Sequence, residues 1–249
     1  MRKSSLFLAA MVALGAVYGA DAVRISDRDG KRVSLFNGRD LSGWEVKCKP
    51  EDRARSWWSV ADGAIEANSL GVAKHDYIWL VTTREYTNFV LRFQFQAFHD
   101  SPGNTGVQIR SRYDDAAGWL DGPQVDINPP GVWRTGMVWD ETRGNQRWLW
   151  PVIPKGTWVN EKMAMPGATF HFADDTQAKW NDFEVSVNGT RLEARLNGVA
   201  VMTWDGAGVL DDATHRERRV GMFGPIALQI HTGDQLKIRF KDIRIRELP

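Results

Sequence analysis

The sequence contains a single cysteine, Cys48, and this scarcity excludes a disulfide within the chain. Stability must therefore come from the packed core. The chain also has little net charge, because 32 Lys and Arg residues face 31 Asp and Glu residues, which leaves a formal charge of +1. Such a balance provides no long-range field to recruit nucleic acid or an anionic membrane. We therefore expect a ligand that is neutral or recognised locally.

Helical periodicity and the common catalytic motifs are missing as well. No window repeats apolar residues at spacings of three and four, so few helices are expected. The sequence has no His-x-x-x-His, no cysteine cluster, no calcium loop, no glycine-rich phosphate loop and no nucleophile elbow. Because these motifs are absent, the sequence does not identify a cofactor. Asp126 and His231 could hold a divalent metal only if the fold brings them together.

The first residues carry the only long apolar run of the chain. Arg2 and Lys3 precede apolar residues 6–17, and small residues follow at Ala20 and Ala22. This pattern is typical of a secretory signal peptide, and the run is too short for a stable transmembrane helix. Cleavage is expected after Ala22, with Ala20 as the alternative. We therefore predict an exported protein, periplasmic or extracellular, without membrane insertion after cleavage.

The remaining residues, 23–249, are predicted to form a single all-β domain. Residues 89–96 and 236–241 alternate between apolar and polar side chains, which describes strands buried on one face. Asn188-Gly189 separates two further runs, and Asn197-Gly198 follows the second of them, so hairpins are expected there. Many short antiparallel strands with such turns favour a two-sheet sandwich over a closed barrel.

Residues 114–168 are different in kind and are predicted to be an insert rich in Trp and Pro, with long loops and short strands. Long ordered loops on a rigid scaffold often carry function. This segment contains Trp133, Trp139, Trp148 and Trp150. Indole rings fill cores, which is the commoner role for any single Trp, but they also stack on the C–H faces of sugars. Their clustering beside Gly, Pro and charged residues favours a carbohydrate platform.

Three predicted strands carry polar residues at a spacing of two, and a half-buried sheet presents such residues to one side. These stripes are Asn104, Gln108 and Arg110; Gln124 and Asp126; and Gln229 and His231. An ordinary solvated face is the alternative for any one stripe. Solvated faces are usually rich in Lys, Glu, Thr and Ser, however. Asn, Gln, Arg, Asp and His beside glycines indicate hydrogen bonding to a ligand.

Seven short motifs run in order along the chain and cover nearly all of its mature part. They are SLFNGRDLSGW at 34–44, GNTGVQIR at 103–110, GPQVDI at 122–127, WNDF at 180–183, NG at 197–198, GPIALQIH at 224–231 and FKDIRI at 240–245. Together they resemble the 3-keto-disaccharide hydrolase family, formerly a domain of unknown function. Each motif alone is loose, but their order and completeness make the match specific.

This resemblance implies a concanavalin A-like jelly roll, export, and action on glycosides whose sugar carries a ketone at C3. The polar positions of the family correspond to Asn104, Arg110, Gln124, Asp126, Gln229 and His231. One departure concerns Gly122-Pro123, which precedes Gln124 where the family more often has glycine, an aromatic residue and glutamate. This departure leaves the identity of the catalytic base open.

The implied chemistry is an elimination, because a ketone at C3 acidifies the proton at C2. A base removes that proton, the substituent at C1 leaves, and water then adds. We expect His231 or Asp126 to be the base and Glu141 to be the acid for the leaving group. Arg110, Gln124 or a bound metal would stabilise the enolate oxygen. The other residues assigned to substrate binding are Asn104, Gln108, Gln229, Trp139 and Trp148.

Two other functions compete with this hypothesis. A lectin-like carbohydrate-binding module would use the Trp cluster as its platform, whereas a conventional glycosidase would use two carboxylates, such as Asp126 and Glu141. A pure binding module has little use for an Arg, an Asp and a His converging on one face. The sequence therefore favours an enzyme.

Overall fold

The computed structural model describes residues 24–27, 30–101, 103–128, 134–154, 159, 167–174 and 177–249. The predicted signal peptide, residues 1–22, and Trp133 lie outside the described residues.

The larger of two main sheets, sheet A, has ten strands in the described part of the chain. They are β1 (Arg24–Asp27), β2 (Gly30–Ser34), β4 (Trp58–Ala61), β5 (Ala64–Asn68), β7 (Phe89–Phe98), β14 (Phe172–Ala173), β15 (Asn181–Asn188), β16 (Arg191–Leu196), β17 (Val199–Asp205) and β19 (Lys237–Glu247). Seven of them follow the order β1-β2-β19-β7-β15-β16-β17. β14 pairs with β7, and β5 pairs with both β19 and β4.

The smaller sheet, sheet B, has seven strands. They are β3 (Trp44–Cys48), β6 (Ile78–Thr82), β8 (Thr105–Gln108), β11 (Pro123–Ile127), β12 (Val138–Asp140), β13 (Arg147–Trp150) and β18 (Ala227–Ile230). Their order is β13-β12-β11-β8-β18-β6-β3. A separate hairpin is formed by β9 (Arg112–Asp114) and β10 (Trp119–Asp121), and the helical elements are η1 (Pro50–Asp52) and α1 (Ala213–Arg218). The described part of residues 114–168 contains β10 to β13, three of which form one edge of sheet B.

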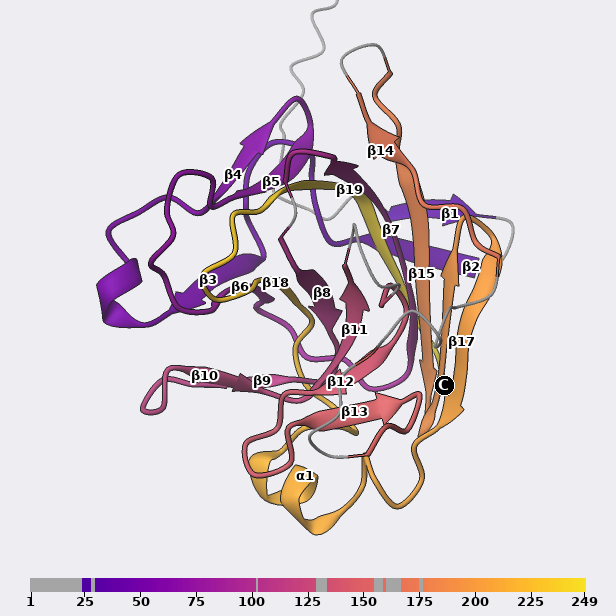
Figure 1. Ribbon diagram of the computed structural model, residues 1–249. Helices are drawn as coiled ribbons and strands as arrows, with labels where there is room; N and C mark the ends of the chain where they lie inside the picture. Colours follow the sequence, from indigo (N-terminus) through magenta and orange to yellow (C-terminus); the bar gives the residue numbers. More distant parts are fainter. Residues whose placement is uncertain are drawn as a thin grey trace, which may run out of the picture.

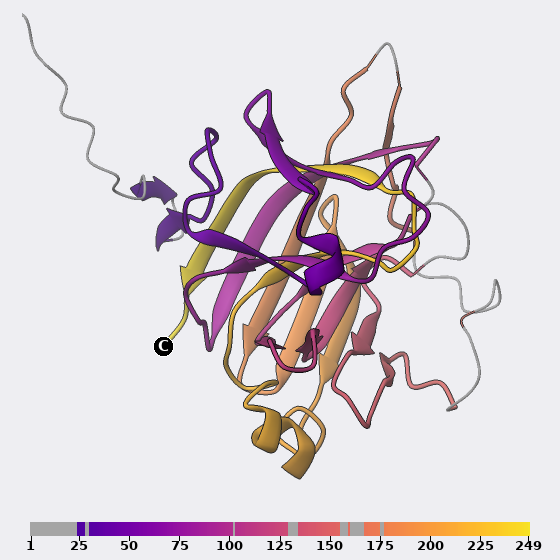
Figure 2. The ribbon, with the colours of Figure 1, turned by 90° about the vertical axis from the view of Figure 1, so that its left-hand side faces the viewer.

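The strands form where the sequence alternates. β15, β16 and β17 form the two predicted hairpins, in which each strand pairs antiparallel with the next. Their turns need backbone with positive φ, which Gly189 (56°), Asn197 (49°) and Gly198 (81°) adopt. Figures 1 and 2 show the two sheets from perpendicular directions, with α1 at the lower end of the molecule. The prediction of an antiparallel two-sheet jelly-roll sandwich is therefore confirmed.

The core lies between the two sheets. Phe93 and Phe183 contribute to it from sheet A, and Val107 and Leu228 contribute from sheet B. Each of these side chains is at most 3% exposed. Burial of a large apolar side chain contributes about 1.5–3 kcal/mol relative to its exposure. Because these inward residues alternate with outward ones, both sheets present their polar residues on their outer faces.

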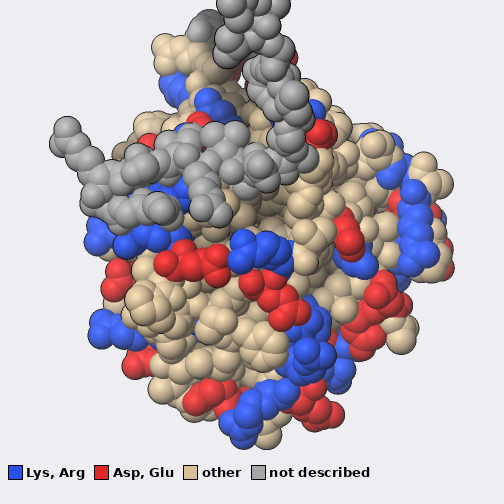
Figure 3. Space-filling view, turned by 180° about the vertical axis from the view of Figure 1, so that it is seen from behind, with Lys and Arg blue, Asp and Glu red and all other residues tan. Residues whose placement is uncertain are grey.

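The surface carries no dominant charge on the side shown in Figure 3. Lys and Arg side chains are interspersed there with Asp and Glu, and neither sign forms a continuous field. This arrangement matches the near balance of the sequence. None of the described helices has both the length and the apolar character that crossing a membrane requires.

Candidate active site on the outer face of sheet B

The outer face of sheet B carries the polar stripes of three neighbouring strands. β11 pairs with β8 in a register that places Gln124 opposite Gln108 and Asp126 opposite Gly106. β18, which carries Gln229, pairs with the other edge of β8. The residues that alternate with these positions are buried and apolar for the most part. The period of two therefore places Gln108, Gln124, Asp126 and Gln229 on one face, as the sequence predicted.

A cavity of about 220 Å³ lies on this face. Seven of the residues that line it were predicted from the sequence: Asn104, Gln124, Asp126, Trp139, Glu141, Trp148 and His231. Three more lining residues, Tyr77, Arg134 and Asp234, were not predicted. The structure thus brings the three candidate acid and base groups to one small cavity, although they come from β11, the residue after β12 and the residue after β18.

Gly106 allows the side chain of Gln124 to lie flat on the sheet. A Cβ atom at Gly106 would stand 2.6 Å from Cγ of Gln124 and 2.9 Å from the backbone oxygen of Val125. Real Cβ atoms do not approach other heavy atoms so closely, so only glycine fits at this position without a shift of its neighbours. Gly106 therefore fixes how Gln124 enters the cavity.

Asp126 and Glu141 are buried carboxyl groups, 2% and 4% exposed. The Nε2 atom of Gln124 donates to Oδ1 of Asp126 at 2.9 Å, and Nε2 of Gln229 donates to Oε1 of Glu141 at 3.3 Å. Burial raises the pKa of each carboxyl to about 7, and the amide donors oppose part of that rise. Near neutral pH the pair therefore offers both a protonated and an ionised carboxyl, which suits acid and base roles.

His231 forms a second polar group with Tyr77 and Asp234. The hydroxyl of Tyr77 lies 3.1 Å from Nε2 of His231. Nδ1 of His231 lies 3.2 Å from the Thr232 carbonyl oxygen and 3.6 Å from Oδ2 of Asp234. The same Asp234 oxygen accepts a hydrogen bond of 2.6 Å from the backbone N–H of Asn104. Burial lowers the pKa of His231, so the imidazole is neutral at pH 7 and can accept a proton.

Aromatic side chains stand around these polar groups. Trp139 lies opposite Trp148 across β12 and β13, with ring centroids 5.1 Å apart and the rings edge to face. The indole Nε1 of Trp119 donates to the backbone oxygen of Glu141 at 2.8 Å. The Trp119 ring packs edge to face on Tyr77 at 4.9 Å. Rings of this kind can both exclude water and contact the apolar faces of a sugar.

Gln108 and Gln229 are part of the predicted stripes but do not line the cavity. Both are fully buried. Nε2 of Gln108 donates to the backbone oxygen of Leu120 at 3.4 Å, so this amide supports the β9–β10 hairpin. Gln229 stands behind Glu141 and holds its carboxyl group. In this structure Gln229 therefore acts on the cavity through Glu141.

The expectation that Arg110 shares the face of Gln108 is wrong. β8 ends at Gln108, and Arg110 has a φ of 50°, so the alternation of the strand does not extend to it. Its fully buried guanidinium donates at 2.5 Å to the carbonyl of Thr87, at 2.6 Å to that of Gly189 and at 3.1 Å to that of Gly221. Burial lowers its pKa to about 10. Arg110 ties together three connecting segments and takes no part in the cavity.

The three lining residues that were missed come from positions with no strand pattern. Tyr77 immediately precedes β6, and Arg134 belongs to the segment between β11 and β12. Asp234 follows His231 by three residues, across a turn in which Gly233 has a φ of 69°. A carboxylate just beyond a turn after a candidate histidine was the one usable signal. Tyr77 and Arg134 offered none.

Asp126 and His231 do line a common cavity, which was the condition for a shared metal. Within the described residues, however, no group of three or more His, Cys, Asp or Glu side chains is placed to hold a metal ion. The arrangement that the structure does show is one of proton donors and acceptors with aromatic walls.

Comparisons with known proteins agree with this fold. A solved structure from Parabacteroides distasonis, provisionally named a glycosyl hydrolase, is 20% identical, with a TM-score of 0.55 over 86% of this chain and 93% of that one. A second from the same organism is 19% identical, with a TM-score of 0.51 over 95% and 94%. The cellulose-induced protein Cip1 is 14% identical, with a TM-score of 0.51 over 87% and 97%. At these identities the likeness concerns the fold alone.

The sequence itself identifies the family. None of the curated proteins matches the chain. The profile of the 3-keto-alpha-glucoside-1,2-lyase-like domain, by contrast, matches residues 31–246, which is most of the sequence. The matched residues include Gln124, Asp126 and His231, which line the cavity. The chain therefore belongs to the 3-keto-disaccharide hydrolase family, whose domain is of the 3-keto-alpha-glucoside-1,2-lyase-like type, and it is a protein that acts on or binds carbohydrate.

Proposed function

We propose that this protein is an exported enzyme that cleaves 3-keto glycosides by elimination across C1 and C2, followed by addition of water. One observation carries the proposal. Two buried carboxyls, whose pKa burial raises to about 7, share a small cavity with a neutral histidine. Such a set can both take and give a proton near neutral pH.

The substrate supplies the rest of the chemistry. The C3 ketone makes the C2 proton acidic, so a base removes it and the electron pair forms an enolate with charge on the ketone oxygen. Collapse of the enolate forms the C1–C2 double bond and breaks the bond from C1 to the leaving oxygen, which takes a proton from the acid. Water then adds across the double bond and gives the free 3-keto sugar. Proton balance needs one base and one acid, and no external oxidant.

The roles follow from the contacts of each group. His231 is the first candidate for the base, because its imidazole is neutral and hydrogen bonded to Tyr77. Asp126 in its ionised form is the second. Glu141 in its protonated form serves as the acid for the leaving group. Arg134 takes the place proposed for Arg110 as the cation near the enolate oxygen, because it lines the cavity.

The conventional glycosidase is the rival that the cavity also supports. Asp126 and Glu141 both line it, and a pair of carboxyls, one of them protonated, is the usual machinery of glycoside hydrolysis. That chemistry needs no ketone on the sugar. The two proposals therefore differ in a property of the substrate that is easily varied.

The test compares a 3-keto glucoside with its unoxidised parent, each incubated with the purified protein with and without a chelator. We expect cleavage of the keto glycoside only. Cleavage of the parent at a similar rate would contradict the elimination and favour the two-carboxylate glycosidase. Binding of either sugar without cleavage would favour a lectin-like module. Loss of cleavage with the chelator would show that a metal takes part.

Export is a separate part of the proposal and rests on the N-terminal pattern alone. Expression of the full-length chain in a bacterial host should yield a mature protein in the periplasm or medium whose N-terminus is Val23, or Asp21 if cleavage follows Ala20. Recovery of the uncleaved chain from the cytoplasm would contradict it.

A further inference from the structure

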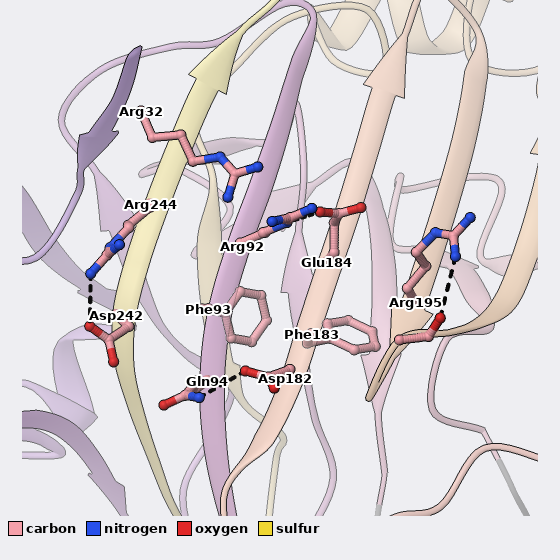
Figure 4. A pocket seen from close by; sticks show the side chains of 11 residues that line it. Arg32, Arg92, Phe93, Gln94, Asp182, Phe183, Glu184, Arg195, Asp242 and Arg244 are labelled. Atoms are coloured by element: carbon pink, nitrogen blue, oxygen red, sulfur yellow. Dashed lines mark hydrogen bonds and ion pairs between the residues drawn. The ribbon is translucent and has the colours of Figure 1, made fainter. Parts of the chain in front are cut away.

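A second hollow lies on the outer face of sheet A, away from the cavity on sheet B. Its volume is about 490 Å³, and it crosses β2, β19, β7, β15 and β16 (Figure 4). Four arginines from four of these strands line it: Arg32, Arg92, Arg195 and Arg244. We call this hollow the arginine groove.

Strand register places most of these charges in one row across the sheet. Arg244 of β19 lies opposite Arg92 of β7. Arg92 lies opposite Glu184 of β15, and Glu184 lies opposite Arg195 of β16. Neighbouring strands are about 4.8 Å apart, so the row from Arg244 to Arg195 spans roughly 14 Å. This length suits an extended ligand with several charges better than a single small anion.

The basic end of the row is costly for the sheet. Arg244 and Arg92 are like charges directly opposite each other, and such pairs destabilise neighbouring strands. Figure 4 shows the Arg32 guanidinium reaching from β2 over β19 toward β7, so a third positive group lies nearby. Arg92 pairs with Glu184, and Arg244 contacts Asp242 at 3.4 Å. Exposed ion pairs of this kind add little to stability, so their partners can be exchanged for those of a ligand. The lining as a whole has four arginines against three carboxylates, Asp182, Glu184 and Asp242, so one positive charge is in excess and an anionic ligand is favoured.

The other side of the groove offers hydrogen-bond acceptors, which are carboxylate groups. Two residues further along the strands, Gln94 lies opposite Asp182 and donates to its Oδ1 atom at 2.8 Å. Asp182 is exposed, and an aspartate carboxylate can only accept hydrogen bonds. Asp242 also lines the groove, from the bulge of β19. Carboxylates beside guanidinium groups match a ligand that carries both carboxylates and hydroxyls.

The floor of the groove excludes recognition by stacking. Phe93 and Phe183 contribute to it, but they are 3% and 1% exposed, and their rings pack on each other in the core at 5.5 Å. Among the described lining residues, no aromatic ring faces the groove. A neutral polysaccharide would lack the usual aromatic platform here. Binding must therefore come from charge and hydrogen bonds.

From these contacts we propose that the arginine groove binds a short acidic oligosaccharide. Its carboxylates pair with the guanidinium groups of Arg92, Arg195 and Arg244, whose planar donors match carboxylate geometry. Its hydroxyls donate to Asp182 and Asp242. The volume of the groove is that of a small-molecule site, whereas a protein partner needs a larger and flatter surface. This site is independent of the proposed cleavage of 3-keto glycosides.

The test is calorimetric titration of the purified protein with trigalacturonic acid and with its fully methyl-esterified form, at low and at physiological salt. We expect the acid to bind and the neutral ester not to bind, with an affinity that falls as salt rises. The double variant Arg92→Gln and Arg195→Gln should weaken binding about tenfold or more, since each loses charge-assisted hydrogen bonds. Cleavage of a 3-keto glucoside should be unchanged in that variant.

Arg191→Gln is the matched control, because Arg191 is exposed four residues before Arg195 on the same face of β16 and lies outside the groove lining. It should leave the affinity for trigalacturonic acid unchanged. The proposal is overturned if the acid does not bind, if the ester binds equally well, or if Arg191→Gln weakens binding as much as the double variant. Equal binding of triglutamate would overturn the assignment to a saccharide. Competitive inhibition of 3-keto glucoside cleavage by the acid would place its site on sheet B and also overturn the proposal.

Discussion

The two outer faces of the sandwich use their polar residues in opposite ways. On sheet B, Asp126 and Glu141 are almost fully buried, and burial raises the pKa of each to about 7. On sheet A, Arg92, Asp182 and Arg195 are exposed to solvent. The same alternation of period two produces both faces. What differs is the cover over sheet B, where loops add Tyr77, Arg134 and Asp234 around the strands. Covering loops bury the polar residues of sheet B and shift their pKa values, which makes them suitable as acid and base groups. The exposed residues of sheet A are suited only to binding.

The largest effect on activity is expected from a substitution at Glu141 on the covered face. Glu141→Gln keeps the shape of the side chain but removes its proton transfer, so kcat/KM for a 3-keto glucoside should fall by about 10²–10⁴-fold. Glu184→Gln, the same change on the open face of sheet A, should leave the rate unchanged. Steady-state kinetics of both variants check the prediction, and equal losses would remove the distinction between the faces.

Arg110 tests the correction that it supports the fold and not the cavity. Arg110→Met removes a fully buried guanidinium that donates to three backbone carbonyls, of which that of Gly221 is buried, so the free energy of unfolding should fall by about 3 kcal/mol or more. Arg195→Met on the open face should change it by less than about 0.5 kcal/mol. Urea unfolding followed by Trp fluorescence measures both. If Arg110→Met is as stable as the wild type but no longer cleaves a 3-keto glucoside, Arg110 belongs to the active site and the correction is contradicted.

A substitution at Gly106 tests whether activity depends on the exact position of Gln124 on the covered face. In Gly106→Ala the new Cβ must displace Gln124, and with it the donor to Asp126, so kcat/KM should fall by about 10- to 100-fold. Gly167→Ala is the control, because a Cβ there has open space and its φ is not positive. Unchanged kinetics in Gly106→Ala would show that the position of Gln124 does not matter.

The buried carboxyls also predict how stability depends on pH. In the unfolded chain Asp126 and Glu141 titrate at about 4, whereas burial raises their pKa to about 7 in the folded protein. Between these values the folded state holds more protons. Their contribution to the free energy of unfolding is therefore full below about pH 4 and lost as the pH rises to about 7, at no more than about 1.4 kcal/mol per pH unit for each group.

The measurement is urea unfolding from pH 4 to 8 of the wild type and of the double variant Asp126→Asn and Glu141→Gln. Comparison of the two chains removes the contribution of His231, which has the opposite sign because its pKa is lowered. We expect the free energy of unfolding to fall with pH less steeply in the variant. Parallel curves would mean that neither carboxyl is shifted as the structure indicates.

Local sequence pattern was sufficient for the sandwich and for most of the covered face. The alternation in β11 and around β18 located Gln124, Asp126 and His231, because a strand repeats every two residues. It failed at Arg110, since the place where β8 ends depends on tertiary packing and not on the pattern. Tyr77 and Arg134 could not be found, because both lie outside the strands, where no alternation predicts the direction of a side chain. The arginine groove escaped notice because its row exists only across paired strands.

The central claim, that the covered face removes the C2 proton of a 3-keto glycoside, is tested most directly with a substrate carrying deuterium at C2. The reaction is stopped early, and the deuterium in the released keto sugar is measured by mass spectrometry. Labelled free keto sugar, incubated alone, corrects for spontaneous exchange. The account predicts that the cleaved product has lost its deuterium to solvent. Full retention of deuterium at C2 in the product would contradict it.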